Sequence, residues 1–505
     1  MKPNRSPNFI LFSLAFGVFI AADDLTVVST MLRQIIFDLE IPLPDGLDQA
    51  TWIVNAYLIA YVVVMPFIGR VSDIVGRRAV YISSLLLFLA GSIWVPFANS
   101  FESFLFGRVL TALGGGAMVP VAMAVIADVY PAEKRATALG TLGAIDTAGW
   151  VWGPLYGALL IRFLTWRWQF YLNIPLTIIG LILAWRALAD LPQPTEKKRI
   201  DWIGTAVLTL VLLCFNIALL NSGDVQSAGG FASFSNEATL SPTTTWILYS
   251  VSIIGMIAFV LIQRNLMQRA AQTAPLINLT LFQRPNFSVA VLINFLVGAI
   301  LIIAMVNVPL LVNVLAVDVA QSALISGYLL SGMTGAMAVM AHVGGKMTER
   351  FSYRLPATIG LLFCISGFAL LGLNWRVNTP FWQSGWQLVI LGIGFGLLTA
   401  PVGTAVINAA PDDQRGIASS LVIVMRLIGM SVGLSGLTAF GLRRFNILRT
   451  QIELPDLPIT DPTYQQAIVD GLVQVTVQVL TETFLVTAVV GVGALIFAFM
   501  LKKDG

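Results

Sequence analysis

The sequence predicts an all-α membrane protein in which fourteen membrane-spanning helices form two six-helix bundles, with two extra helices inserted between them. The first observation is composition: of 505 residues, 57% are hydrophobic and only 11% are charged, whereas a soluble domain carries about 25% charged residues. The second is a series of apolar stretches of about 20 residues, the length that a helix needs to cross a bilayer. The third is that short segments of the first half recur in the second half.

The apolar stretches place the spans in chain order. We expect fourteen of them, at residues 9–31, 50–69, 79–98, 102–127, 136–161, 168–189, 202–221, 244–263, 286–312, 321–343, 355–374, 384–408, 415–440 and 480–501. The first stretch is too long for a signal peptide and contains two aspartates, so it is expected to be retained. This predicts a first six-helix bundle in residues 1–190, a linker with the two inserted spans in 191–285, and a second six-helix bundle in 286–505.

The basic residues orient the chain in the membrane. Most of the 29 Lys and Arg residues fall in segments on the side that also holds both termini, and positive residues concentrate on the cytoplasmic side. We therefore expect a multi-pass protein of the plasma (inner) membrane with both termini cytoplasmic. The net charge of +3 is small and scattered, so we expect no nucleic-acid partner.

Two pairs of segments mark the internal repeat. Residues 69–73 (Gly-Arg-Val-Ser-Asp) correspond to 345–349 (Gly-Lys-Met-Thr-Glu), and residues 131–135 (Pro-Ala-Glu-Lys-Arg) correspond to 411–415 (Pro-Asp-Asp-Gln-Arg). Parallel repeats of this kind build transporters in which two halves rock about a central cavity. The repeat therefore favours a transporter over a channel or receptor.

A short charged turn separates the second and third spans. Its marked positions are Gly69, Asp73, Gly76, Arg77 and Arg78. The glycines allow close helix approach and a sharp turn, and the carboxylate can pair with arginines or with helix ends. Together with Asp128, which is expected at the same membrane face, these residues predict a salt-bridge cluster that closes the cytoplasmic gate in one state. The alternative is a basic loop that only orients the protein.

Asp23, Asp24 and Arg108 are ionisable residues placed well inside the first and fourth spans. Such a side chain costs about 2.5–3.5 kcal/mol on insertion scales unless it is paired or hydrated. A rise of about 1.5 Å per residue puts Asp24 and Arg108 at one depth. A neighbouring cation controls whether a carboxylate is ionised, so we expect Asp24 to carry the coupling proton. The adjacent Asp23 can share this role, because the sequence does not separate the two. The alternative is a fixed Asp24–Arg108 pair that only joins two helices.

Two further ionisable residues, Asp146 and Arg426, lie near the bilayer midplane at corresponding positions of the two repeats. We expect Asp146 to face the central cavity as a cation-binding or second protonatable site. The alternative is an Asp146 that pairs with a neighbouring helix for structure. If the cargo is an anion, Arg108 and Arg426 would be its ligands.

The fifth span carries glycines at every fourth position. Gly149, Gly153 and Gly157 share one helix face, which lets another helix pack at close range, and Pro154 permits a bend. We expect this face to form a close interface between the halves that blocks proton leak. The alternative is ordinary helix packing.

These features resemble the fourteen-span drug:proton antiporter branch of the major facilitator superfamily. The resemblance rests on the 69–78 turn, the first-span segment 24–28 (Asp-Leu-Thr-Val-Val), Arg108, the fifth-span segment 149–157, and Arg426 with Gly429. It implies a proton-coupled exporter (antiporter) of amphipathic or cationic small molecules, working by alternating access as a monomer in the lipid bilayer. The alternative is export of a lipid, metabolite or anionic solute on the same fold, and sodium in place of protons stays open.

Enzyme chemistry has no motif in this sequence. There is no H-E-x-x-H, G-x-S-x-G or P-loop segment. Cys214, Cys364 and the single histidine, His342, lie in or at the ends of apolar stretches. We therefore expect no enzyme activity, no metal site and no cofactor.

Overall fold

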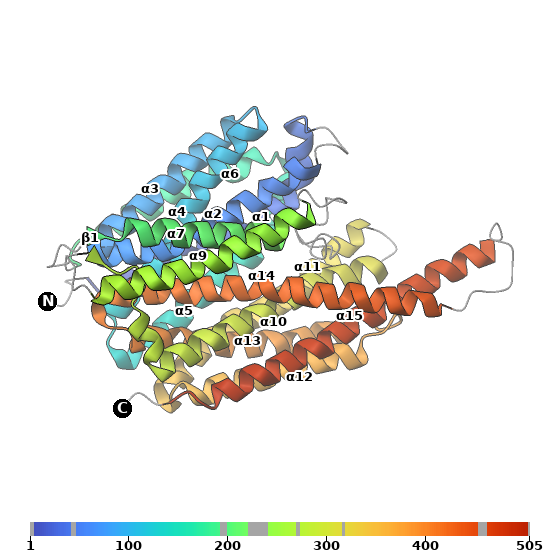
Figure 1. Cartoon of the computed structure of the whole chain (residues 1–505). Helices are drawn as coiled ribbons and strands as arrows, with labels where there is room; N and C mark the ends of the chain where they lie inside the picture. The colour runs from blue at the N-terminus through green and yellow to red at the C-terminus, as the bar shows by residue number, and fades with distance from the viewer. Residues whose placement is uncertain are drawn as a thin grey trace.

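The computed structural model describes residues 5–41, 47–191, 199–220, 241–268, 273–315, 319–452 and 462–502. Within these residues the chain is helical apart from two short strands. The long helices run side by side and form one elongated molecule (Figure 1). The predicted all-helical fold is confirmed.

The first bundle follows the predicted spans closely. Its helices are α1 (Pro7–Asp38), α2 (Leu47–Val75), α3 (Arg77–Trp94), the 3₁₀ turn η1 (Val95–Phe97), α4 (Phe101–Val129), α5 (Ala132–Phe163) and α6 (Arg167–Ala187). Serine hydroxyls cap two of these helices: Ser6 accepts from the N–H of Phe9 in α1, and Ser100 accepts from the N–H of Ser103 in α4.

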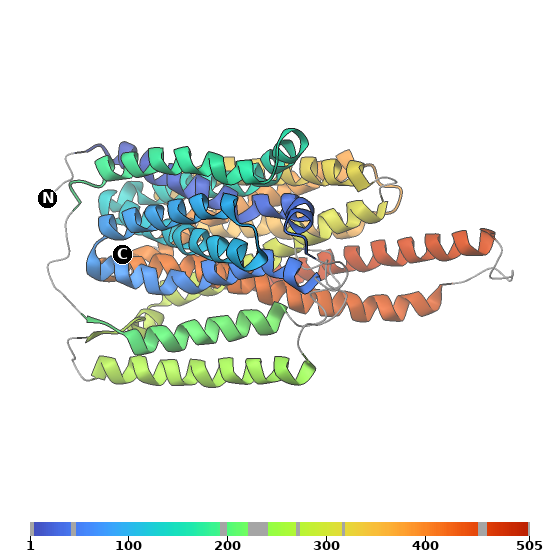
Figure 2. The ribbon, with the colours of Figure 1, turned by 90° about the horizontal axis from the view of Figure 1, so that it is seen from above.

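The inserted segment contains α7 (Trp202–Leu220) and α9 (Pro242–Gln268). The two helices pack on each other beside the bundles (Figure 2). Strand β1 (Arg199–Ile200), just before α7, pairs in parallel with strand β2 (Thr273–Ala274), just after α9. Two hydrogen bonds lie next to this strand pair: the buried Asp201 carboxylate accepts from the N–H of Gly204 at 2.8 Å and from the Gln263 amide at 2.7 Å.

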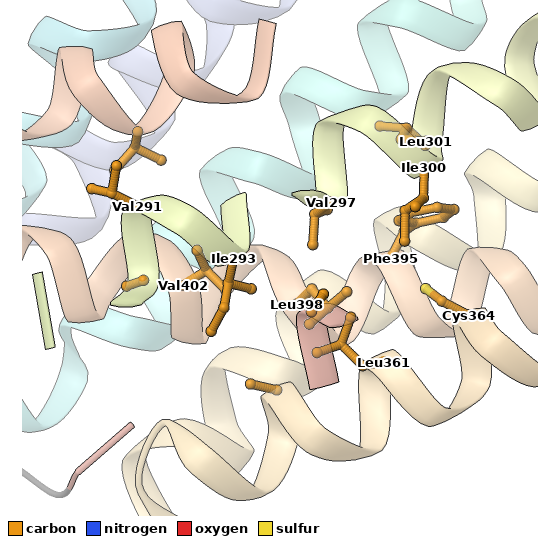
Figure 3. Close-up of a cluster of buried hydrophobic side chains, with 14 of the residues drawn as sticks. Val291, Ile293, Val297, Ile300, Leu301, Leu361, Cys364, Phe395, Leu398 and Val402 are labelled. Atoms are coloured by element: carbon orange, nitrogen blue, oxygen red, sulfur yellow. The ribbon is translucent and has the colours of Figure 1, made fainter. Parts of the chain in front are cut away.

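The second bundle has the same number of long helices as the first in the described residues. The long helices are α10 (Pro285–Leu315), α11 (Val319–Phe351), α12 (Arg354–Asn374), α13 (Phe381–Ala409), α14 (Arg415–Leu448) and α15 (Pro462–Ala498). Short 3₁₀ turns accompany them: η2 (Leu279–Gln283), η3 (Asp412–Gln414) and η4 (Arg449–Gln451). Its core is apolar where α10, α12 and α13 meet. There Val297 faces Phe395 and Leu398, with Leu361 and Cys364 alongside (Figure 3).

Thirteen helices of the described chain are long and apolar enough to cross a membrane. The 32-residue helix α5 packs among them, against α1 and α11. Such a set of long apolar helices is what a multi-pass membrane protein requires.

The segment between the last two spans differs from expectation. The expected spans end at residue 440 and begin at residue 480, but α14 continues to Leu448 and α15 begins at Pro462. The end of α14 and the start of α15, which we call the two arms, project beyond the other helices (Figures 1 and 2). Leu448 packs with Val475 and Val479, and Arg444 pairs with Glu482 at 2.6 Å. The arms stay helical because this apolar seam and ion pair join them.

The start of α1 and the end of α15 lie at the same end of the molecule (Figure 1). We call this the gate end, because the two bundles touch there. A Cβ built on Gly345 of α11 would lie 2.6 Å from the carbonyl oxygen of Ala136 in α5. Ten residues earlier in α11, a Cβ on Gly335 would meet no atom of the described residues within 4 Å. The contact between α5 and α11 is therefore tight at the gate end, whereas Gly335 faces open space.

Candidate functional site: a gate and two buried charge sites

Asp73 joins the two bundles at the gate end. Its carboxylate, at the end of α2, accepts from the N–H groups of Gly416 at 2.8 Å and Ile417 at 3.1 Å, in the first turn of α14. It also pairs with Arg77, and its side chain is only 1% exposed. A carboxylate at a helix N-terminus satisfies free N–H groups and interacts favourably with the helix dipole. The buried Asp73 therefore stabilises the contact between the two bundles through both effects.

Asp128, at the end of α4, extends this cluster. It accepts from Arg77 Nε at 3.2 Å in its own bundle and from Arg415 at 3.0 Å in the other bundle. Arg70 adds a second bridge by donating to the carbonyl oxygen of Asp413 at 3.1 Å. Sequence reasoning missed Arg415 as a residue of this cluster, although it lies in a repeated segment.

Arg78 is the exception among the predicted gate residues. Its guanidinium lies 4.8 Å from the ring centroid of Trp185 in α6, and it donates to the carbonyl oxygen of Ala189. One residue corresponds to a turn of about 100° around a helix, so Arg78 points away from the neighbouring Arg77. The expectation that Arg78 belongs to the cluster is therefore wrong.

The two glycines of the turn have distinct structural roles. Gly76 has φ 113°, a backbone angle that disfavours any residue with a Cβ, and it separates α2 from α3. Gly69 lies against α14, where a Cβ would come within 2.9 Å of the Cβ of Ser420. Gly76 therefore makes the turn, and Gly69 permits the close contact between the bundles.

The second repeat provides a counterpart to Asp73. Glu349, at the end of α11, accepts from the N–H of Thr137 in the first turns of α5 at 2.8 Å. Glu349 occupies the position that corresponds to Asp73 in the repeat. Each half therefore places an acidic side chain against a helix of the other half, which agrees with the predicted repeat.

Two further polar contacts between the bundles were missed by sequence reasoning. His342 of α11 lies with Nδ1 2.8 Å from the Thr141 hydroxyl of α5. Arg135 of α5 donates to Asn408 of α13, whose amide in turn donates to Tyr353 at 2.7 Å. A lone histidine at the end of an apolar stretch gives no signal for such a contact, because the placement of the second bundle is not visible locally.

Asp24 and Arg108 form a fully buried ion pair inside the first bundle. The guanidinium of Arg108 lies 2.8 Å from Asp24 Oδ2, and the side chains of Asp24 and Arg108 are 0% and 1% exposed. Arg108 also lies 4.1 Å from the ring centroid of Tyr57. The two residues therefore lie at one depth, as their positions in the spans predict.

Helix α6 completes this site with two amides. Asn173 donates to Asp24 at 3.2 Å, and Gln169 donates to Asp23 at 2.9 Å. Asp23 is 6% exposed and faces α6 rather than Arg108. Two adjacent carboxylates thus have different partners, one cationic and one neutral. Gln169 and Asn173 were not predicted as site residues.

Asp146 of α5 and Arg426 of α14 approach each other from the two bundles. Their charges interact, but no ion pair of 4.0 Å or less joins these two described residues. Oδ1 of Asp146 is buried without a hydrogen-bond partner in the described part of the chain. Arg426 instead donates to Asn294 at 3.2 Å, beside a cavity of about 10 Å³ that is also lined by Thr399. This volume suits about one water molecule.

The glycine face of α5 packs within the first bundle. A Cβ on Gly149 would lie 2.7 Å from that of Ala22, one on Gly153 would lie 2.9 Å from the carbonyl oxygen of Asp23, and Gly157 packs on the same helix, α1. The expected interface between the halves is therefore wrong, because the spacing fixes a close helix neighbour without identifying it. The side chain of Pro154 lies outside the described residues.

A metal site has no support in the described part of the chain, where no three His, Cys, Asp or Glu side chains gather around one point. The buried carboxylates Asp23, Asp24 and Asp73 instead have arginine, amide or backbone N–H partners.

Comparisons with known proteins agree with this architecture. Residues 14–434 match the family described as the Major Facilitator Superfamily. The chain is similar to a triacylglyceride transporter of Mycolicibacterium hassiacum, with 31% identity over 484 residues that cover 92% of this chain and 86% of the relative. It is also similar to a probable triacylglyceride transporter of Mycobacterium leprae, with 30% identity over 504 residues that cover 95% and 94% of the two chains.

Solved structures show the same fold at low sequence identity. The proton:xylose symporter XylE has a TM-score of 0.61 and 13% identity, covering 98% of this chain and 96% of its own. The human organic anion transporter MFSD10 has a TM-score of 0.59 and 12% identity, covering 97% and 100%.

Both mycobacterial relatives carry the name of triacylglyceride transporters, so the finer resemblance to the drug:proton antiporter branch stays a prediction. The family match spans most of the chain, and the two relatives are at least 30% identical over nearly its whole length. The chain therefore belongs to the major facilitator superfamily and is a multi-pass membrane transporter, not an enzyme.

Proposed function

We propose that this transporter exports an apolar lipid of the triacylglyceride class and takes up protons in exchange. The observation that carries the proposal is the similarity, over nearly the whole chain, to proteins named triacylglyceride transporters. Of the two cargo classes that the sequence suggests, this similarity favours the lipid over the amphipathic or cationic small molecule. The protein is proposed to act as a monomer in the plasma membrane, with both termini cytoplasmic.

The surface between the bundles supports an apolar cargo. Tyr57, Tyr61 and Met65 of α2 pack with Val424 of α14, and Leu427 lies against the same cluster. An apolar molecule that passes between the bundles would meet this apolar surface, whereas a charged molecule would lose its hydration there. We call the proposed route along this surface the passage. The bundles, proposed as residues 1–190 and 286–505, would rock about this passage, with 191–285 inserted beside it.

Asp146 and Arg426 are the proposed coupling groups in this passage. A carboxylate with an oxygen that lacks a hydrogen-bond partner in the described chain can take up a proton without breaking an existing bond. Loss of its charge would remove its attraction to Arg426 in the opposite bundle and so favour separation of the halves there. Asp23 meets the same condition, because its Oδ1 is also buried without a hydrogen-bond partner in the described chain. Asp24 is a further candidate proton carrier, but its proton would have to displace the bonds from Arg108 and Asn173.

The experiment compares cargo and coupling in proteoliposomes. We expect the wild-type protein to release a fluorescent triacylglycerol analogue to acceptor vesicles faster than protein-free liposomes do. Asp146→Asn should abolish the dependence of this release on a pH gradient, because the amide cannot exchange a proton. The matched control is Asp190→Asn, an exposed position just after α6.

Two results would count against the proposal. Transport of ethidium without transport of the triacylglycerol analogue would establish the amphipathic-cation function instead. Gradient-dependent release by Asp146→Asn equal to that of the wild type would remove Asp146 from the coupling step.

A further inference from the structure

A large groove lies between the inserted helix α7 and the first bundle. Its volume is about 540 Å³, and its walls come from α2, α3, α4 and α7. Representative lining residues are Val63, Phe67, Val75, Leu87, Leu113 and Thr209. All of its walls belong to membrane-spanning helices, so the bilayer, not water, supplies what fills it.

Two of the four hydroxyl groups that line the groove are already hydrogen-bonded within their own helices. Ser84 donates to the carbonyl oxygen of Val80 at 2.8 Å, and Thr205 donates to that of Asp201 at 2.6 Å. These bonds within helices satisfy both donors. The groove therefore presents an essentially apolar surface to its occupant.

The length of the groove matches a hydrocarbon chain that lies in one leaflet. Val63 and Val75 are twelve residues apart on α2, which corresponds to about 18 Å along a helix. One leaflet contributes about 15 Å of hydrocarbon, half of a core of about 30 Å. Along α2 the groove thus spans about the hydrocarbon depth of one leaflet.

We call the end of the groove at Val75, Ala79 and Trp202 its mouth; it lies at the gate end, with a basic residue nearby in the chain. Trp202 is 64% exposed, and its ring centroid lies 5.5 Å from that of Phe67 inside the groove. Tryptophan is typical of the membrane interface. Arg199 in β1 is exposed three residues before Trp202, which keeps its backbone within about 10 Å of the mouth. A basic residue at this level attracts anionic headgroups.

We propose that the groove is a binding site for one acyl chain of an anionic phospholipid, with the headgroup held near Arg199. The lipid belongs to the leaflet at the gate end. It fills the space between the inserted hairpin and the first bundle, so it acts as a resident lipid of the transporter and not as its cargo.

Photolabelling of the full-length protein in nanodiscs tests this site. The probe is phosphatidylglycerol with a diazirine on one acyl chain, and mass spectrometry locates the labelled peptides. We expect labelling to concentrate on the groove faces of α3 and α7. Thr209→Phe should lower it several-fold by filling the groove, whereas Leu210→Phe, on the exposed side of the same helix, should leave it unchanged. Thermal unfolding of both variants shows whether each remains folded.

The headgroup is tested with a second pair of variants and probes. Labelling by phosphatidylglycerol should exceed labelling by phosphatidylcholine, and Arg199→Gln should remove this preference while Arg264→Gln, an exposed position on α9, preserves it. Equal labelling of α7 and the lipid-facing side of α9, or no effect of Thr209→Phe, would overturn the site. Stronger labelling by a diazirine triacylglycerol would assign the groove to cargo instead. Because the readout is labelling, these results are independent of transport.

Discussion

Replacing Asp73 with asparagine should shift the transporter toward the state in which the gate end is open. The carboxylate accepts two N–H groups of α14 from the opposite bundle. Asparagine keeps one acceptor oxygen but places an NH₂ group against the other N–H. It also removes the negative charge from the helix N-terminus and from Arg77.

The size of the shift follows from the lost contacts. One hydrogen bond to a charged group is worth about 1.5–3 kcal/mol, and the interaction with the helix dipole adds about 0.3–1 kcal/mol. These contacts join the two bundles, so they exist only while the gate is closed. A loss of about 2–4 kcal/mol should therefore raise the ratio of open to closed molecules about 30- to 700-fold.

Pulsed electron spin resonance measures this ratio directly. Spin labels at Glu133 of α5 and Thr358 of α12 report the distance between the bundles at the gate end, after Cys214 and Cys364 are replaced. The control is Asp412→Asn, because Asp412 is 86% exposed and its pair with Arg415 should contribute only about 0–1 kcal/mol. An unchanged distance distribution in Asp73→Asn would refute the reasoning that this carboxylate closes the gate.

Three other substitutions test the packing and the buried charges. Asp24→Asn should lower the free energy of unfolding by about 3–5 kcal/mol, because it leaves the charge of Arg108 buried and unpaired. The control, Asp38→Asn, breaks a partly exposed ion pair and should lower it by only about 0–1 kcal/mol. Equal losses of stability in the two variants, measured by thermal unfolding, would contradict this. Gly153→Ala should destabilise by about 1–3 kcal/mol, since its Cβ meets the backbone of α1, and an unchanged unfolding temperature would show that α1 can give way. His342→Ala should remove a hydrogen bond between the bundles worth about 0.5–1.5 kcal/mol and so shift the spin-label distances at the gate end toward the open state. Unchanged distances would show that this bond does not stabilise the closed state.

Most of the fold could be predicted because each span is marked by its own length and apolarity. The ends of the helices were harder, since polar residues continue a helix without an apolar signal. The outer arms of α14 and α15 are an example, because prolines and charged residues gave this part of the sequence the character of a loop. Leu448, Val475 and Val479 form the seam that holds the arms together, but the two sides of that seam are separated in the chain.

The candidate site shows the same division between local and distant information. The depth of Asp24 and Arg108 follows from counting residues along a helix, and the structure joins them. The neighbour of the Gly153 face does not follow from its spacing, and it is α1 instead of the opposite bundle. Contacts such as that of His342 depend on how two bundles dock, which no single segment encodes.

The most direct test of lipid export driven by protons is gradient-driven release of a fluorescent triacylglycerol analogue from proteoliposomes. The protein is reconstituted with its gate end inside, and the external medium is made acidic relative to the lumen. Release to acceptor vesicles should accelerate when the gradient is imposed and return to the basal rate when an ionophore collapses it. Release that is the same with and without the gradient would contradict proton coupling, and release no faster than from protein-free liposomes would contradict lipid export itself.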